Sequence, residues 1–210
     1  MKNKISARGF AFLALLVLAT GCEKNESFYY ADPQTPGVAI LSNKGNNILT
    51  CFMNGHPWKT LPRTINYGFG RSTTELQIRR TKTNSLTDTL TITWRTDASN
   101  QDQYDIVLTL PVAKNFQPKD MAAYQGKRIE IDSTNGYFSL NQSYSSFSSY
   151  NGKGVIYFNT ANLDSTGIDN ITGRISGLLE ANFYPGSNIA QSITSGRFDD
   201  NISALEFWDF

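Results

Sequence analysis

Apolar and polar residues alternate with a period of two along most of the chain after residue 37. In residues 89–95 apolar side chains alternate with threonines and a final arginine, and residues 171–183 keep one phase for thirteen positions. This alternation is typical of strands with one buried face. Gly173 and Gly177 occupy apolar positions of the longer run, which indicates a bend or a close approach of two backbones. Further strands are predicted at 38–41, 48–53, 64–70, 75–79, 105–110, 128–132, 137–141, 155–159, 192–198 and 204–208.

Turn residues separate these runs. Asn135-Gly136, between the predicted strands at 128–132 and 137–141, is the clearest hairpin signal. A single short helix is predicted at 118–124, because Pro118 suits its first turn and Gly126 ends it. About ten or eleven antiparallel strands with one short helix predict an all-β domain, either an antiparallel β-sandwich or a partly open β-barrel.

The N-terminus carries an export signal. Three basic residues within the first eight precede an apolar run at 10–18. The run is shorter than the roughly 20 residues that span a bilayer, and it is typical of a secretory signal. Residues 18–22, Leu-Ala-Thr-Gly-Cys, resemble the bacterial lipobox, in which the cysteine is acylated and the chain is cleaved before it.

The lipobox resemblance implies a diacylglyceryl thioether and an N-acyl group on Cys22, and several acyl chains make attachment to a lipid bilayer stable. We therefore expect a signal peptide at 1–21, a lipidated tether at 22–37 and one all-β domain at 38–210. Glu23 and Glu26 resemble the signal that sends some Bacteroidetes lipoproteins to the cell surface, whereas Lys24 departs from it. The expected location is the cell envelope, at the outer membrane, with its periplasmic and surface faces both open.

Charge and cysteine content narrow the partners. Without residues 1–21 the chain keeps 16 basic and 18 acidic residues, a net charge of −2. This balance disfavours nucleic-acid binding, which relies on an excess of basic residues. If Cys22 is lipidated, Cys51 has no disulfide partner, and its apolar surroundings predict a small buried side chain.

Candidate catalytic groups are few. The single histidine, His56, precedes a proline in a predicted turn, where it is expected to be solvated. The chain lacks paired histidines and Cys-x-x-Cys spacing, so no zinc site or other cofactor is predicted. The carboxylates near Asp164 and Asp169, and at Asp199-Asp200, could bind calcium. The favoured interpretation is that they accept hydrogen bonds from backbone N–H groups in turns. Glutamates for glycan hydrolysis would come from the predicted strands, where solvated positions are expected: Glu130, Glu180 and Glu206. We expect no enzymatic activity.

Three segments together resemble a family of small Bacteroidetes lipoproteins with an all-β domain of unknown function. They are Phe-Met-Asn-Gly-His-Pro-Trp at 52–58, Gly-Val-Ile-Tyr-Phe at 154–158 followed by Ile-Thr-Gly-Arg-Ile-Ser-Gly at 171–177, and Ile-Thr-Ser-Gly-Arg-Phe at 193–198. Ile175 stands where the family pattern has an aromatic residue. The resemblance covers most of the mature chain and implies the β fold, the lipid anchor and the envelope location, without site residues.

Aromatic residues supply the candidate ligand surface. A serine-rich segment at 141–154 carries three aromatic residues and is interpreted as a mobile loop or a contact loop. Trp58, Tyr144, Tyr150 and Trp208 are candidates for stacking on a sugar or contacting a partner, the alternative being that they cover the ends of the β domain.

Two short motifs suggest glycosylation. Asp-Ser-Thr at 132–134 and again at 164–166 resemble the O-glycosylation signal of Bacteroidetes envelope proteins, which makes Ser133 and Ser165 candidate sites. Intact mass of the native protein tests this hypothesis, because a mass equal to polypeptide plus lipid would contradict it.

Three functions are compatible with these features. The leading hypothesis is a non-enzymatic, membrane-anchored binding module for an envelope protein or a glycan. A lipocalin-like carrier of an apolar ligand is the alternative and would need a large apolar cavity. A carboxylate-dependent glycan hydrolase is the weakest of the three.

The anchor is tested by replacing Cys22 with serine. The hydroxyl cannot form the thioether, so the Cys22→Ser protein should move from the membrane pellet to the soluble fraction. Fractionation with immunodetection measures this, and equal membrane recovery of both proteins would contradict lipidation.

Overall fold

The computed structural model describes residues 31–60, 63–67, 70–74, 76–95, 104–142, 149–165, 171–184, 191–203 and 207–209. Their regular structure is β apart from one short helix, which confirms the predicted all-β class. The elements are β1 (Ala31–Asp32), β2 (Thr35–Ala39), β3 (Ile48–Met53), β4 (His56–Lys59), β5 (Arg63–Tyr67), β6 (Gly70–Thr74), β7 (Leu76–Lys82), β8 (Thr87–Trp94), β9 (Tyr104–Ala113), η1 (Pro118–Tyr124), β10 (Lys127–Ile131), β11 (Tyr137–Gln142), β12 (Ser149–Ser165), β13 (Ile171–Phe183), β14 (Gln191–Ser203) and β15 (Phe207–Asp209).

One large sheet forms the body of the molecule. Its strands follow the order β15-β7-β8-β9-β11-β12-β13-β14-β3-β4, and β10 pairs with β12 beside this path. Neighbouring strands of the large sheet are antiparallel, except that β15 pairs parallel to β7. This one pair departs from the predicted antiparallel pattern. The remaining strands form two small hairpin sheets, β1–β2 and β5–β6.

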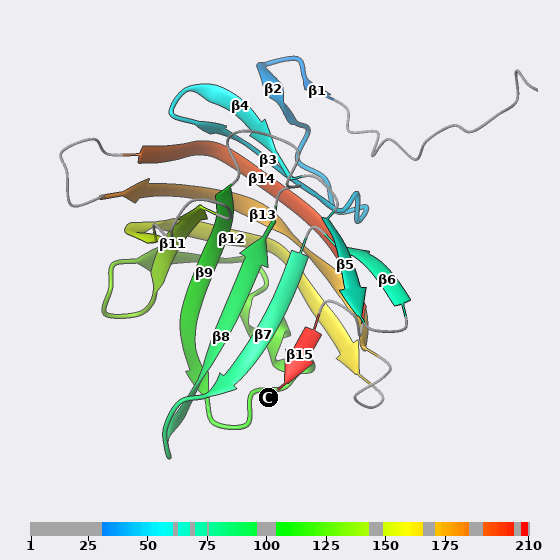
Figure 1. The fold of residues 1–210 in the computed structure, drawn as a ribbon, viewed down its shortest axis with the longest axis vertical. Helices are drawn as coiled ribbons and strands as arrows, with labels where there is room; N and C mark the ends of the chain where they lie inside the picture. Colours follow the sequence, from blue (N-terminus) through cyan, green and yellow to red (C-terminus); the bar gives the residue numbers. More distant parts are fainter. Residues whose placement is uncertain are drawn as a thin grey trace, which may run out of the picture.

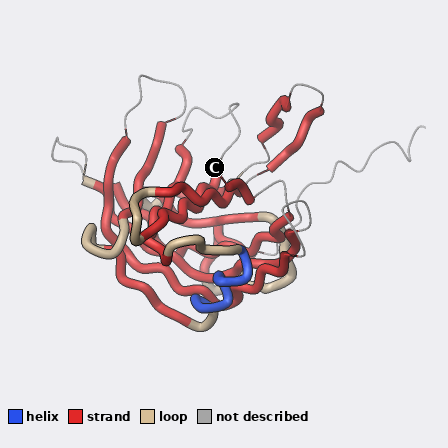
Figure 2. Tube along the Cα trace, turned by 90° about the horizontal axis from the view of Figure 1, so that it is seen from below, coloured by secondary structure: helices blue, strands red, loops and turns tan. Residues whose placement is uncertain are grey.

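The large sheet curls into a half-barrel. Figure 1 shows β7, β8 and β9 lying across the long strands β12, β13 and β14, and Figure 2 shows the strands curving round a common interior with η1 at its side. This arrangement agrees with the predicted partly open barrel. The inward side chains of β8 are fully buried while its threonines are half-exposed, as the alternation predicts.

Aromatic rings fill the interior between strands β7–β9 and the long strands β12–β14. The ring of Trp94 on β8 lies 5.2 Å from that of Phe198 on β14, and Phe198 lies 5.8 Å from Phe158 on β12. Tyr124 at the end of η1 continues the row, 5.8 Å from Phe158. Tilted and edge-on rings at these separations are favourable packing arrangements. Burying each such side chain contributes roughly 1.5–3 kcal/mol, so this row is a major source of stability.

The long strands approach one another closely at glycines. A Cβ atom added to Gly177 on β13 would lie 1.9 Å from the Tyr157 carbonyl oxygen, and one added to Gly173 would lie 2.1 Å from the Asn162 carbonyl oxygen. Both glycines therefore occupy close backbone approaches, which is one of the two roles predicted for them.

The predicted Asn135-Gly136 hairpin is wrong. β10 and β11 pair with successive parts of the same edge of β12 and run in the same direction, so residues 132–136 are an outward loop within one edge. The Asp132 carboxylate accepts hydrogen bonds from the Thr134 amide, at 3.0 Å, and from the Thr134 hydroxyl, at 2.6 Å. Gly136 lies against β9, where a Cβ would come 2.5 Å from the Thr109 carbonyl oxygen. The glycine therefore permits contact with β9 rather than a chain reversal.

Two other predicted segments differ from the structure. The strand expected at 64–70 is the β5–β6 hairpin, in which Tyr67 pairs with Gly70; glycines weaken strand interiors, and this stretch contains two. The predicted tether at 22–37 extends into the folded part of the chain, because β1 and β2 already form a hairpin from Ala31 onward.

The helix lies at the predicted residues and is a 3₁₀ helix. Pro118 opens it, and the Asp120 carboxylate accepts a 2.7 Å hydrogen bond from the Gln117 amide. Gly126 follows with φ +70°, a left-handed conformation that ends a helix readily. η1 thereby places Met121 in the interior, where its side chain is fully buried.

Gly177→Ala should destabilise the protein by about 3 kcal/mol, because the new methyl group must displace the backbone of β12. Denaturant unfolding measures the free energy. Gly55→Asn is the control, since its surroundings are open and asparagine tolerates positive φ; equal losses in both variants would contradict the close-approach explanation.

Candidate functional site

The predicted ligand-surface aromatics do not form one surface in the described structure. Trp58 on β4 and Tyr150 on β12 are half-buried and pack against the core. Trp208 lies on β15, at the opposite end of the strand order from β4, and its side chain lies outside the described set. Tyr144 lies outside the described residues altogether. The two aromatic side chains that can be placed therefore lie against the core.

Cys51 and His56, the candidate nucleophile and base, do not form a catalytic pair. Cys51 is fully buried, which raises the pKa of its thiol well above the usual range and confirms the predicted buried side chain. His56 is exposed on β4 opposite Met53, in agreement with its predicted solvated position.

The candidate metal and hydrolase carboxylates are separated. Asp199 lies on the outer face of β14, whereas Asp200 lies inside and accepts a 3.2 Å hydrogen bond from the Trp94 indole nitrogen. Glu130 and Glu180 are exposed, as predicted. Asp164 is exposed on β12; Asp169 and Glu206 lie outside the described residues. Within the described ranges no group of three His, Cys, Asp or Glu side chains could hold a metal ion.

Ser133, a candidate glycosylation site, lies in the exposed loop at 132–136 with φ +78°. The backbone of Ser165 ends β12, and its side chain lies outside the described set.

The outer face of β12, β13 and β14 carries two hollows, which sequence reasoning did not identify. The first, called here the polar hollow, has a volume of about 530 Å³. Its lining includes two charged residues, Asp164 and Arg174. The uncharged polar residues of the lining are Asn43, Thr160, Asn162, Thr172 and Asn201. Amides, hydroxyls and one charge of each sign offer both hydrogen-bond donors and acceptors.

One wall of the polar hollow is held in place by hydrogen bonds. The Arg174 guanidinium donates to the Asn43 carbonyl oxygen and, at 3.4 Å, to the Asn201 side-chain oxygen. Asn201 in turn donates to the Gly45 carbonyl oxygen at 2.8 Å, and its backbone amide donates to the Asn47 side chain at 2.8 Å. The wall is therefore positioned before any ligand binds.

The connection between β2 and β3 lies on the middle of this outer face. The Asp199 carboxylate accepts hydrogen bonds from the amides of Lys44, at 3.0 Å, and Gly45, at 2.8 Å, and from the Ser42 hydroxyl. This carboxylate caps backbone N–H groups, as the alternative to a calcium site predicted. Ser176, the cross-strand neighbour of Asp199, is fully buried. The connection thus separates the polar hollow from the second hollow.

The second hollow, called here the apolar hollow, has a volume of about 420 Å³. Its lining includes Val155, Tyr157 and Leu178, with Arg128 and Arg197 among the charged residues at its sides. Tyr157 and Leu178 are cross-strand partners, and Leu178 remains 38% exposed. This hollow therefore presents an aromatic and an aliphatic side chain to solvent.

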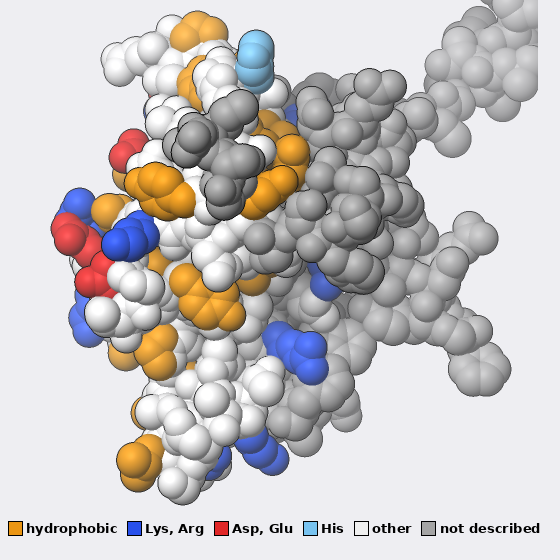
Figure 3. Space-filling model, turned by 60° about the vertical axis from the view of Figure 1, so that its left-hand side comes forward, with side chains coloured by type: hydrophobic (Ala, Val, Ile, Leu, Met, Phe, Trp, Pro, Cys, Tyr) orange, Lys and Arg blue, Asp and Glu red, His pale blue; other side chains and the backbone are white. Residues whose placement is uncertain are grey.

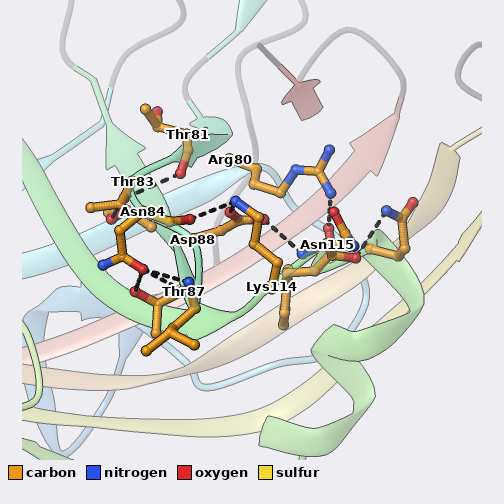
Figure 4. Close-up of polar contacts among 12 residues, drawn as sticks. Arg80, Thr81, Thr83, Asn84, Thr87, Asp88, Lys114 and Asn115 are labelled. Carbon is orange, nitrogen blue, oxygen red and sulfur yellow. Dashed lines mark hydrogen bonds and ion pairs between the residues drawn. The ribbon is translucent and has the colours of Figure 1, made fainter.

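A charged cluster closes one end of the interior (Figure 4). Asp88 is buried and forms a 3.0 Å ion pair with Lys114, while the Asn115 amide donates to its second oxygen at 2.8 Å. Arg80 is also buried and donates to the Phe116 carbonyl oxygen at 2.7 Å. Burial raises the pKa of the Asp88 carboxyl, but the hydrogen bonds and the charges of Lys114 and Arg80 outweigh burial and lower it below the usual range. Asp88, Lys114 and Arg80 each have a partner within the domain, which indicates a structural role.

The described surface has mixed character. In Figure 3 hydrophobic side chains lie in several separate groups among uncharged polar atoms, with lysines and arginines mostly toward the margins of this face. No helix within the described ranges is long and apolar enough to cross a membrane.

Comparisons of this chain with protein-family models, with curated proteins and with solved structures gave no match.

Asp88→Asn should lower the thermal midpoint at pH 7, because Lys114 and Arg80 lose a buried counter-charge. The folded-state pKa of Asp88 lies below the unfolded value of about 3.9, so its contribution is present above that pH and is lost as pH falls through the folded pKa. The difference in thermal midpoint between Asp88→Asn and the natural protein should therefore become smaller below about pH 4. Thermal melts from pH 7 to pH 2 measure it, with the exposed Asp164→Asn as control; a pH-independent difference would contradict the ion pair.

Proposed function

We propose that the protein is a lipid-anchored envelope protein that binds a glycan in the polar hollow. The observation that carries the proposal is the lining of that hollow, in which Asn162 and Thr172 project from neighbouring strands beside the fixed Arg174 wall. Sugars carry many hydroxyl groups that both donate and accept hydrogen bonds. Asparagine amides and threonine hydroxyls match this chemistry without the cost of burying an unpaired charge.

The anchor is the second part of the proposal. The lipobox-like residues before Cys22 support acylation, and Ala31, the first residue that the structure describes, follows nine positions later in strand β1. A glycan-binding domain on so short a tether would work close to the membrane. The proposal includes an outer-membrane location and membership of the Bacteroidetes lipoprotein family, both supported by the sequence resemblance.

A binding role is favoured over a carrier role by the interior. The row of rings from Trp94 through Phe198 to Phe158 occupies the space that an apolar ligand would need. A binding role is favoured over hydrolysis because Glu130 and Glu180 are exposed strand residues, whereas glycan cleavage uses paired carboxylates across a cleft.

A protein partner is the second candidate, and the apolar hollow favours it. Tyr157 and the half-exposed Leu178 are the kinds of side chain that anchor protein interfaces. Binding there should leave the polar hollow free, so the two candidates can be separated by site.

The glycan proposal is tested with envelope polysaccharides and a glycan array. Replacing both Asn162 and Thr172 with alanine removes two hydrogen-bonding side chains from the polar hollow and should weaken glycan binding roughly tenfold or more. Calorimetry or array titration measures the affinity. Thr91→Ala, on the outer face of β8, is the matched control and should bind normally.

Two results would overturn the glycan proposal. One is equal affinity of the double variant and the natural protein. The other is the absence of measurable binding of the natural protein to any of the envelope polysaccharides and arrayed glycans.

A further inference from the structure

The N-terminal hairpin is fastened to the outer face at Arg197. The guanidinium donates to the Asp32 carboxylate at 2.6 Å and to the Ala39 carbonyl oxygen at 2.8 Å, and lies 3.4 Å from the Thr35 hydroxyl. Both charged side chains are largely buried, at 18% and 17% exposure. One arginine on β14 therefore holds β1, β2 and the end of the hairpin together, and we call these contacts the Arg197 latch.

The latch fixes where the tether leaves the domain. Arg197 also lines the apolar hollow, so β1 begins beside that hollow. Eight residues, 23–30, lie between Cys22 and Ala31, and the nine steps from one to the other span at most about 30 Å when fully extended. A domain tethered through Cys22 must therefore hold the latch within about 30 Å of the bilayer.

Exposed apolar side chains lie next to the latch along the chain and across the sheet. Of the six large hydrophobic residues exposed in the described part of the chain, Ile40 and Leu41 directly follow the latched Ala39, and Leu178 is the cross-strand partner of Arg197. Ile40 is 47% exposed and Leu41 38%. The partly exposed Tyr157 lies next to Leu178. Aliphatic side chains beside a tyrosine are the composition found at membrane interfaces.

We infer that this patch, formed by Ile40, Leu41, Tyr157 and Leu178, rests on the surface of the bilayer. The inference rests on the proposed acylation of Cys22, because the short tether is what brings the patch to the membrane. The nearby guanidinium groups already have carboxylate partners: Arg197 pairs with Asp32, and Arg128 lies 2.5 Å from Glu130. Contact should therefore depend on the apolar side chains and change little with salt.

Site-specific lipid quenching tests the inference on the full-length lipidated protein. Ile40→Cys carries an environment-sensitive fluorophore at the patch. Leu86→Cys is the matched control, because Leu86 is 79% exposed and lies on the β7–β8 turn, at the opposite end of the long axis from β1 and β2 (Figure 1). Cys51 is fully buried and Cys22 is acylated in this protein, so only the introduced thiol should react.

Each labelled protein is reconstituted into vesicles of phosphatidylethanolamine and phosphatidylglycerol with and without a brominated lipid. The label at residue 40 should lose at least twice as large a fraction of its fluorescence to bromine as the label at residue 86, at both 0.1 M and 0.5 M salt. Adding Arg197→Gln frees the hairpin and should reduce the difference between the two positions. Thermal melts of the labelled and Arg197→Gln proteins confirm that each is folded.

Flotation of the vesicles separates the two possible failures. If the protein does not float with the vesicles, Cys22 is not acylated, and both the anchor and the bilayer contact are overturned. If it floats and the labels at 40 and 86 are quenched equally, the anchor stands and the bilayer contact is overturned. If the cysteine at residue 40 is protected from labelling in native membranes but not in vesicles, the patch binds a protein partner instead. That result would also overturn the bilayer contact.

Discussion

Burial of Trp94 between β8 and β14 is the contact on which the interior of the half-barrel depends. Its ring lies against Phe198, and its indole nitrogen donates to the buried Asp200 carboxylate. A buried tryptophan needs an acceptor for its N–H, and the buried Asp200 carboxylate supplies one. The strands that cross in Figure 1 are thereby joined by both apolar packing and a polar contact.

The outer face of β12, β13 and β14 is where the domain offers chemistry to its surroundings. Alternation sends Phe198 and Asp200 inward and sends Arg197, Asp199 and Asn201 outward along one strand. The outward residues then have structural tasks as well: Asp199 fastens the β2–β3 connection, and Asn201 supports the wall of the polar hollow. A single strand therefore supports the core on one side and organises the proposed binding face on the other.

The Arg197 latch relates the proposed anchor to the proposed binding face. Because Arg197 ties the β1–β2 hairpin to β14, the first described strand keeps its place on the outer face as long as this largely buried ion pair holds. Hydrogen bonds from the Gln34 amide and from Arg197 stabilise the charged form of the Asp32 carboxyl and lower its pKa below the usual range. The latch should therefore persist at neutral and mildly acidic pH.

The sequence alone determined the fold class, the helix at Pro118 and the inward phase of long strands such as Ile171–Phe183, because periodicity and turn chemistry are local properties. It also contained an unused signal: Asp88 lies in phase with Leu90 on β8, which places a charge in the interior. Only the tertiary structure decided that Gly136 serves a contact with β9 instead of a hairpin, that β15 runs parallel to β7, and that Arg197 meets Asp32 across 165 positions of sequence separation. Those features depend on which strands become neighbours when the sheet curls, and an alternating pattern records the face of a residue but not its partner.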